Sequence, residues 1–187
     1  MRNHKLLFLI TLGYFMLGLV NIHLALAGLL CMGLPFVLLF RTRRKTWCQG
    51  LCPRASLFSF WGSVRPGEGR RVPGIFRGPD LRFVVLGYFG LNLLFVLLST
   101  VAVGTGRIAS MEYIRLLMVF AFPGPLPSLL PWSPGIPWLT HLAYRVYSLM
   151  LTSTLVGLGL AWIWRSRTWC LICPVGNLSQ RLSKQWK

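Results

Sequence analysis

The chain has 187 residues, of which 55% are hydrophobic and 12% are charged. A charged fraction so far below the roughly 25% of soluble domains, with a mean hydropathy of +0.61, excludes an ordinary soluble domain and predicts an all-α membrane protein. The 20 Lys and Arg against 3 Asp and Glu give a net charge of +17. Because these basic residues interrupt apolar runs and no motif for reading bases is present, we expect a lipid bilayer and no nucleic acid as the partner.

The first apolar run extends from Leu6 to Phe40, about twice the roughly 20 residues that cross a hydrocarbon core. Asn21 and His23 lie in its middle, so the run predicts a hairpin of two helices whose first arm, Leu6 to Val20, is short. Two further spans are predicted, Phe83 to Val103 and Val146 to Trp164. About four transmembrane helices would bring both chain termini to the same side of the bilayer.

The basic residues predict which side that is, since Lys and Arg near the ends of spans are retained in the cytoplasm. Two of them precede Leu6, ten lie from Arg41 to Arg82 and five lie from Arg165 onward. The opposite loop holds only three, Arg107, Arg115 and Arg145. This asymmetry predicts a multi-pass protein of the bacterial cytoplasmic (inner) membrane with both termini in the cytoplasm.

The outer loop, residues 104–144, holds six of the twelve prolines, which excludes a continuous helix across it. Its apolar part, Tyr113 to Phe122, is only about half a span long. This part either lies in the membrane interface or is re-entrant, dipping into the bilayer and returning. A fifth span here would place the last part of the chain outside, against the distribution of arginines.

Two segments of this single membrane domain (1–187) repeat each other, 46–57 and 168–178. Each contains Thr-Trp-Cys, and each cysteine pair ends in Cys-Pro. The first pair has the spacing CxxxCP and the second CxxCP. Four of the five cysteines lie in these motifs, on the predicted cytoplasmic side: Cys48, Cys52, Cys170 and Cys173.

The prolines after the motifs predict that Cys52 and Cys173 are N-caps and that Pro53 and Pro174 open helices, since proline fits the first helical position. A helix N-terminus favours the thiolate form of cysteine. The helix after Pro174 is predicted to be amphipathic and basic and to lie on the membrane surface. Its apolar positions are Val175, Leu178, Leu182 and Trp186, and Ala55 to Trp61 is a weaker version of this pattern.

Four thiolates on one face suit a [4Fe–4S] cluster or a tetrahedral zinc ion, held by Cys48, Cys52, Cys170 and Cys173. Two other functions remain open from the residues alone. One is a membrane thiol–disulfide oxidoreductase, in which the two pairs exchange disulfides. The other is a scaffold that holds zinc or copper and recruits a partner.

The segments from Trp47 to Ser56 and from Trp169 to Leu178, with the helix layout, resemble the membrane-bound 4Fe-4S binding proteins. That family is related to the quinol-dehydrogenase subunits of periplasmic nitrate reduction and to the nitrous oxide reductase maturation regulator. It carries repeated CxxxCP motifs at the cytoplasmic ends of transmembrane helices. The resemblance implies electron transfer between the quinone pool, or a partner subunit, and a cytoplasmic carrier. Because the chain lacks the separate ferredoxin modules of the larger relatives, it implies a component of a redox complex with a redox partner protein, rather than a stand-alone enzyme.

Residues outside the cysteine pairs have two interpretations each. His23 and His141 fall near the outer ends of spans, where they could hydrogen-bond a quinone; satisfying backbone groups is the commoner role, and haem is not expected. Cys31 is expected to be a small apolar core residue. Four arginines beside the motifs could offset the charge of a thiolate-bound cluster: Arg43, Arg44, Arg165 and Arg167.

Overall fold

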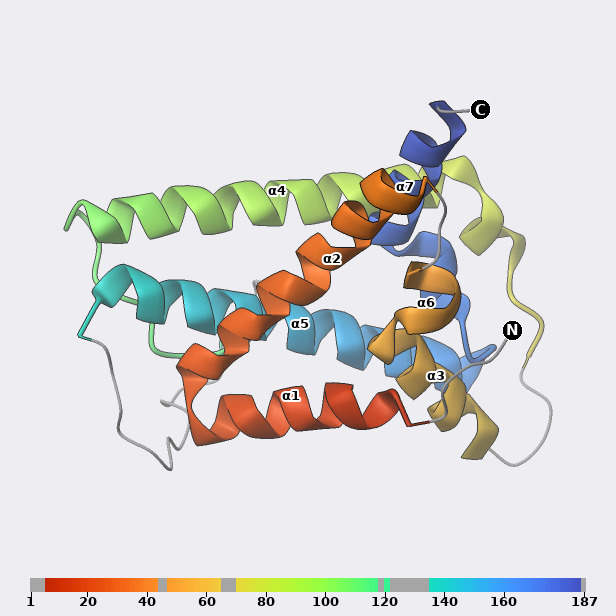
Figure 1. The fold of residues 1–187 in the computed structure, drawn as a ribbon, viewed down its shortest axis with the longest axis horizontal. Helices are drawn as coiled ribbons and strands as arrows, with labels where there is room; N and C mark the ends of the chain where they lie inside the picture. The colour runs from red at the N-terminus through yellow and green to blue at the C-terminus, as the bar shows by residue number, and fades with distance from the viewer. Residues whose placement is uncertain (1–5, 44–46, 65–69, 118–119, 122–134, 186–187) are drawn as a thin grey trace. The chain divides into compact units, whose positions relative to one another are not determined.

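The computed structural model describes residues 6–43, 47–64, 70–117, 120–121 and 135–185 (Figure 1). Most of them are helical. The helices are α1 (Phe8–Val20), the 3-10 helix η1 (Ile22–Leu26), α2 (Ala27–Thr42), the π-helical turn η2 (Trp47–Leu51), α3 (Pro53–Val64), the 3-10 helix η3 (Gly74–Arg77), α4 (Pro79–Gly104), α5 (Pro137–Ile163), α6 (Thr168–Ile172) and α7 (Pro174–Gln185). Two short strands, β1 (Arg115–Leu116) and β2 (Phe120–Ala121), lie between α4 and α5 in sequence.

Three stretches of helix are long and apolar enough to cross a membrane: Ile22–Thr42, which joins η1 to α2, then α4 and α5. The first helix, α1, is also apolar but has only 13 residues, fewer than the roughly 17–25 that a span requires. Leucine, valine and phenylalanine side chains of α4 are widely exposed, as they are on a surface that faces lipid. The prediction of a helical protein suited to a membrane is confirmed, and the fourth span stays a prediction.

The first hairpin turns where the sequence predicts. The α1 helix ends at Val20, and Asn21 caps η1 by accepting a hydrogen bond from the backbone N–H of His23 at 2.9 Å. Asparagine is well suited to this place because its side chain replaces the missing backbone partner at a helix start. The two arms of the apolar run are therefore separate helices, as expected.

The structure differs from the expectation for the outer loop in two details. The α5 helix begins at Pro137, so the predicted start of the last span at Val146 lies inside the helix, and the last part of the predicted loop 104–144 is helical. Proline is favourable there because the first helical N–H needs no partner. The all-α prediction also misses the antiparallel pairing of β1 with β2 within Tyr113 to Phe122. The prolines at 123, 125, 127, 131 and 134 lie outside the described residues.

The chain forms two compact units. Unit 1 comprises Met1–Thr11, Cys31–Phe89 and Thr154–Lys187, and unit 2 comprises Leu12–Leu30 and Gly90–Ser153. Unit 1 contains both cysteine motifs and both termini. It also contains every Lys and Arg of the sequence except Arg107, Arg115 and Arg145, which belong to unit 2. Nearly all of the basic residues therefore belong to the unit that contains the two cysteine motifs.

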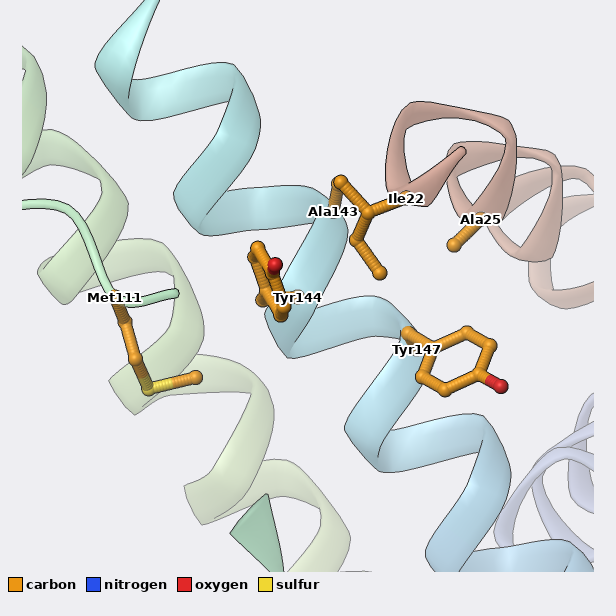
Figure 2. Packing of buried hydrophobic residues seen from close by; sticks show 6 residues of the cluster. All are labelled: Ile22, Ala25, Met111, Ala143, Tyr144 and Tyr147. Atoms are coloured by element: carbon orange, nitrogen blue, oxygen red, sulfur yellow. The ribbon is translucent and has the colours of Figure 1, made fainter. Parts of the chain in front are cut away.

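The core of unit 2 is a cluster of six buried residues around α5 (Figure 2). Three of them belong to α5, two to η1 and one to the segment before β1: Ala143, Tyr144, Tyr147, Ile22, Ala25 and Met111. The hydroxyl of Tyr14 donates to the carbonyl of Ala25 at 2.9 Å, which satisfies one polar group inside this apolar cluster.

The core of unit 1 includes α3, the helix that follows the first cysteine motif. Phe58 of α3 is 1% exposed and packs on Gly157 of α5, where an added Cβ would fall on the phenyl ring. The adjacent Ser59 accepts a hydrogen bond from Nε of Arg167 at 2.9 Å. Gly62 similarly leaves room for Ser166. The helix that follows the first motif is thus packed against the residues that lead into the second.

Candidate functional site

The first motif consists of one helical turn, a cysteine and a new helix. The N–H of Cys52 donates to the carbonyl of Trp47 at 2.9 Å, which closes the turn η2. The carbonyl of Cys52 accepts from Ser56 at 3.2 Å, and its sulfur accepts from the backbone N–H groups of Ala55 and Arg54. These contacts are those of an N-cap residue, so the predicted role of Cys52 at the start of α3 is confirmed.

The second motif repeats this arrangement. The N–H of Cys173 donates to Trp169 at 2.9 Å, and its carbonyl accepts from Asn177 at 3.0 Å in the first turn of α7. Thr168, which is 1% exposed, donates through its hydroxyl to the carbonyl of Arg165 at 2.8 Å and so tightens the approach to α6. Cys173 is therefore also an N-cap, and Pro174 opens α7 as predicted.

The structure accounts for the unequal spacing of the two motifs. In the second motif, Trp169 and Cys173 are joined by an α-helical hydrogen bond between residues four apart. In the first motif, the N–H of Cys52 donates to the carbonyl of Trp47, so the hydrogen-bonded turn contains one more residue and is the π-type turn η2. Single π turns commonly accommodate one extra residue at functional sites. Both motifs thus place a tryptophan carbonyl on the N–H of the capping cysteine.

The two motifs lie within electrostatic range of each other inside unit 1. Desolvation of the sulfur, followed by the neighbouring thiols of Cys173 and Cys52, raises the pKa of Cys170 to about 12, although part of this residue reaches solvent. Cys48 adds a smaller effect in the same direction, and the guanidinium of Arg167 opposes it. None of the four predicted ligands forms a disulfide.

Cys52 has similar surroundings. Desolvation raises its pKa, the N–H of Ala55 and the guanidinium of Arg54 lower it, and the thiol of Cys173 raises it again. With their pKa values raised, Cys52 and Cys170 keep their protons at neutral pH in the metal-free protein. Because only thiolates bind metals, loading a metal centre here must release protons.

The arginines near the thiols are only partly those that the sequence suggested. Arg167 acts on Cys170 as expected. Arg54 acts on Cys52 but was missed, although it directly follows the Cys-Pro pair. Arg43 instead ends α2 in a left-handed conformation with φ of 51°, and Arg44 lies outside the described residues. Arg165 contributes backbone groups to the turn before α6.

The fifth cysteine also lies close to the motifs. Cys31 of α2 is half-buried and is within electrostatic range of Cys52, Cys173 and Arg54. The sequence predicted only a core residue at this position. Nothing in its local pattern pointed to the other thiols, because the relation depends on the packing of α2 in unit 1.

The two histidines use their ring nitrogens within unit 2. Nδ1 of His141 accepts from the backbone N–H of Met111 at 3.1 Å, so its other nitrogen, Nε2, carries the proton and donates to Ser99 at 3.0 Å. His23 contacts Asn21 at 3.0 Å and Thr140 at 3.2 Å. His141 is also 3% exposed. Both histidines therefore have the commoner of the two predicted roles, since their ring nitrogens satisfy polar groups of the protein.

The donor set fits an iron–sulfur cluster in its chemistry. Such clusters are held by four cysteine thiolates, and the motifs supply four thiols that form no disulfide, with arginines beside two of them. The described residues contain no group of three His, Cys, Asp or Glu side chains arranged for a single metal ion. A cluster is several atoms across, so its ligands stand further apart than those of one ion.

Comparison with known families points to the same chemistry. Residues 24–71 and 148–187 match the family described as "4Fe-4S binding domain". Each matched segment contains one of the two cysteine motifs. The match supports an iron–sulfur protein with a 4Fe-4S cluster as its cofactor. No curated protein and no solved structure matches the chain.

Proposed function

We propose that this chain is a membrane electron-transfer protein in which Cys48, Cys52, Cys170 and Cys173 hold one 4Fe-4S cluster. The observation that carries the proposal is the match of residues 24–71 and 148–187, each with one cysteine motif, to the family described as "4Fe-4S binding domain". The thiols of Cys52, Cys170 and Cys173 also lie within electrostatic range of one another. When bound, such a cluster supplies one-electron transfer. The protein's own residues supply the ligands, the nearby positive charge and the attachment to the membrane.

The proposed membrane arrangement has four spans, with both termini and both motifs in the cytoplasm. It rests on the retention of Lys and Arg on the cytoplasmic side, and on the fact that unit 1 contains all but three of these residues. The 13 residues of α1 would then cross with the help of flanking residues or local thinning of the bilayer. A bacterial inner membrane is the proposed location.

The proposed orientation of α7 is parallel to the membrane surface. Asn177 and Ser179 are buried, at 9% and 3% exposure, whereas Leu178 is 37% exposed. The helix therefore turns polar side chains toward the protein and an apolar one away from it. This pattern suits a helix that rests on the acyl chains at the headgroup boundary.

The proposed electron path joins the quinone pool, or a partner subunit, to a cytoplasmic carrier. These 187 residues hold no cysteine outside the two motifs except Cys31, so they supply no second complete four-cysteine set. The chain is thus proposed to be a component of a redox complex with a redox partner protein.

The test is anaerobic purification of the full chain, with assays of iron and acid-labile sulfide and electron paramagnetic resonance of the reduced protein. We expect about four iron and four sulfide per chain, as for one 4Fe-4S cluster. Replacing any of Cys48, Cys52, Cys170 or Cys173 by Ser should remove most of the iron and the signal. Cys31→Ser, at the fifth thiol, is the matched control and should keep both.

Three outcomes would contradict the proposal. Protein free of iron but carrying reversible Cys48–Cys52 and Cys170–Cys173 disulfides would indicate thiol–disulfide exchange instead. Zinc or copper in place of iron and sulfide would indicate a metal-holding scaffold. An unchanged spectrum after all four replacements would show that the cluster is held elsewhere.

A further inference from the structure

An extended segment of unit 2 runs along one face of α5. Three of its backbone N–H groups donate to side chains of the helix. The pairs are Met111 N to His141 Nδ1 at 3.1 Å, Arg115 N to Ser148 Oγ at 3.1 Å, and Leu117 N to Thr152 Oγ1 at 3.3 Å. The three acceptors share one face of α5, since their spacings are close to whole turns of about 3.6 residues. The helix thus supplies the partners that this non-helical backbone needs.

These three contacts hold the segment against α5 over a considerable length of the helix. His141 and Thr152 are about 16 Å apart along α5, which is about half of a hydrocarbon core of roughly 30 Å. Non-helical backbone is tolerated inside a membrane only where the protein or water satisfies its polar groups. In the membrane arrangement proposed above, a segment held to α5 in this way would enter the bilayer with the helix, as the re-entrant alternative for the outer loop requires.

Arg145 lies on the same face of α5, between His141 and Ser148. Its Nε is buried and has no hydrogen-bond partner among the described residues. Arg115, whose backbone is bound to Ser148, brings a second guanidinium into electrostatic range of the first. The guanidinium of Arg115 donates to the hydroxyl of Tyr113 and lies 5.1 Å from the centre of its ring.

Among the residues that the structure describes, no acidic side chain compensates this pair of guanidinium groups. Glu112 is the only acidic residue in the sequence of unit 2, and its side chain is exposed. Neither Arg115 nor Arg145 forms an ion pair with any residue that the structure describes. Two cations beside an apolar helix repel each other, and charge removed from water is stable only when it is paired. An anion from outside the protein would supply the missing partner.

We propose that Arg115, Arg145 and the hydroxyl of Tyr113 bind the phosphate group of an anionic phospholipid. Guanidinium groups present planar arrays of N–H donors that match phosphate oxygens. The hydroxyl of Tyr113 accepts from Arg115, so its own hydrogen is available for a phosphate oxygen. Basic pockets of membrane proteins bind lipid headgroups in this manner.

The depth of Arg145 favours a lipid over a soluble anion. The α5 helix has 27 residues and is therefore about 40 Å long, which in the membrane arrangement proposed above is enough to cross the hydrocarbon core and reach into both headgroup layers. Arg145 lies about 12 Å along the helix from Pro137, just inside the hydrocarbon boundary, from which a long side chain reaches back to the phosphates. A phospholipid arrives there through the bilayer, whereas free phosphate would have to leave water.

The experiment titrates the delipidated full chain, in a neutral detergent, with phosphatidylglycerol, phosphatidylcholine or inorganic phosphate, and follows the unfolding temperature. Phosphatidylglycerol should raise it saturably, because a ligand that binds only the folded state stabilises it. Arg145→Gln and Arg115→Gln should each weaken the apparent Kd by about tenfold or more. Arg107→Gln, at an exposed arginine of the same loop, is the matched control and should leave the Kd unchanged.

Two results would overturn the proposal. One is the same affinity for phosphatidylglycerol in the wild type and in both glutamine variants. The other is saturable stabilisation by inorganic phosphate equal to that by the lipid, which would assign the arginines to a free anion. Arg115 lies outside the helices, so Arg115→Gln tests the site even where Arg145→Gln fails to fold. The result is independent of the iron–sulfur centre, because no cysteine is involved.

Discussion

At the residue scale, one cysteine of each motif, Cys52 and Cys170, combines desolvation with a nearby cation. Desolvation raises the pKa of Cys52 and of Cys170, while Arg54 and Arg167 respectively oppose that rise. The same desolvation strengthens every charge interaction at the site, because less water screens it. Arg54 and Arg167 therefore help to offset the negative charge that the four thiolates carry together.

This arrangement predicts the effect of removing one cation. Arg54→Gln should shift the midpoint potential of the bound cluster to more negative values, by roughly 20–60 mV, since the reduced form carries one more negative charge and loses a stabilising cation. The measurement is a redox titration followed by electron paramagnetic resonance. Iron content should stay as in the wild type, because Arg54 is not a ligand.

The control for this shift is Arg41→Gln. Arg41 is an exposed residue in the last turn of α2 and is not among the charges that act on Cys52 or Cys170. Its replacement removes the same charge and should leave the potential unchanged within a few millivolts. Equal shifts in the two variants would mean that net charge alone, rather than the place of Arg54 beside Cys52, sets the potential.

At the scale of elements, each motif is a unit of one turn, a capping cysteine and a helix opened by proline. The units differ only in the turn, which is of the π type in η2 and α-helical in α6. In both cases the capping cysteine donates its N–H to a tryptophan carbonyl at 2.9 Å. The spacing of cysteines is thus a property of the turn, and the position of the closing thiol is a property of the helix start.

Shortening the first motif tests this equivalence. Deleting Gly50 leaves Trp-Cys-x-x-Cys-Pro, the spacing of the second motif, and should convert the π turn into an α turn. Gly50 is suited to the deletion because an added Cβ there would contact nothing within 4 Å. We expect the variant to keep its iron and labile sulfide, measured after anaerobic purification.

The matched control deletes Leu171 from the second motif. The remaining Cys-x-Cys-Pro has too few residues for one helical turn between Trp169 and Cys173, so iron and sulfide should be lost. Loss of the cluster in both deletion variants would show that the π turn itself is required.

At the scale of the whole molecule, the fold and the charge divide the chain in the same way. The unit that contains both cysteine motifs also contains both termini and nearly all of the basic residues. Since basic residues are held in the cytoplasm, this coincidence leads to a prediction about membrane sidedness. The predicted location of both termini on one side also distinguishes four transmembrane spans from three, because an odd number of spans would put the two termini on opposite sides.

Reporter fusions test the sidedness. Green fluorescent protein joined after Lys187 should fluoresce, and alkaline phosphatase at the same place should be inactive, because that enzyme needs an oxidising compartment for its disulfides. Alkaline phosphatase inserted at the exposed turn of Gly106, which has φ of 73°, should be active. Active phosphatase after Lys187 would indicate three or five spans and place the second motif outside.

The sequence by itself determined the parts of the site that depend on local chemistry. The Cys-Pro pairs predicted two N-caps because proline has no N–H to satisfy, and both are found. Asn21 in the middle of an apolar run predicted the turn of the first hairpin for a similar reason. The four candidate thiols were also evident, because cysteine pairs with shared neighbours are uncommon in apolar sequence.

Only the tertiary structure decided how distant residues are brought together. The mutual influence of the two motifs, the cation of Arg54 and the place of Cys31 depend on packing within unit 1. The early start of α5 was missed because His141 looks like a polar loop residue until Met111 and Ser99 supply its hydrogen-bond partners. Such contacts join residues far apart in the chain, and no local periodicity encodes them.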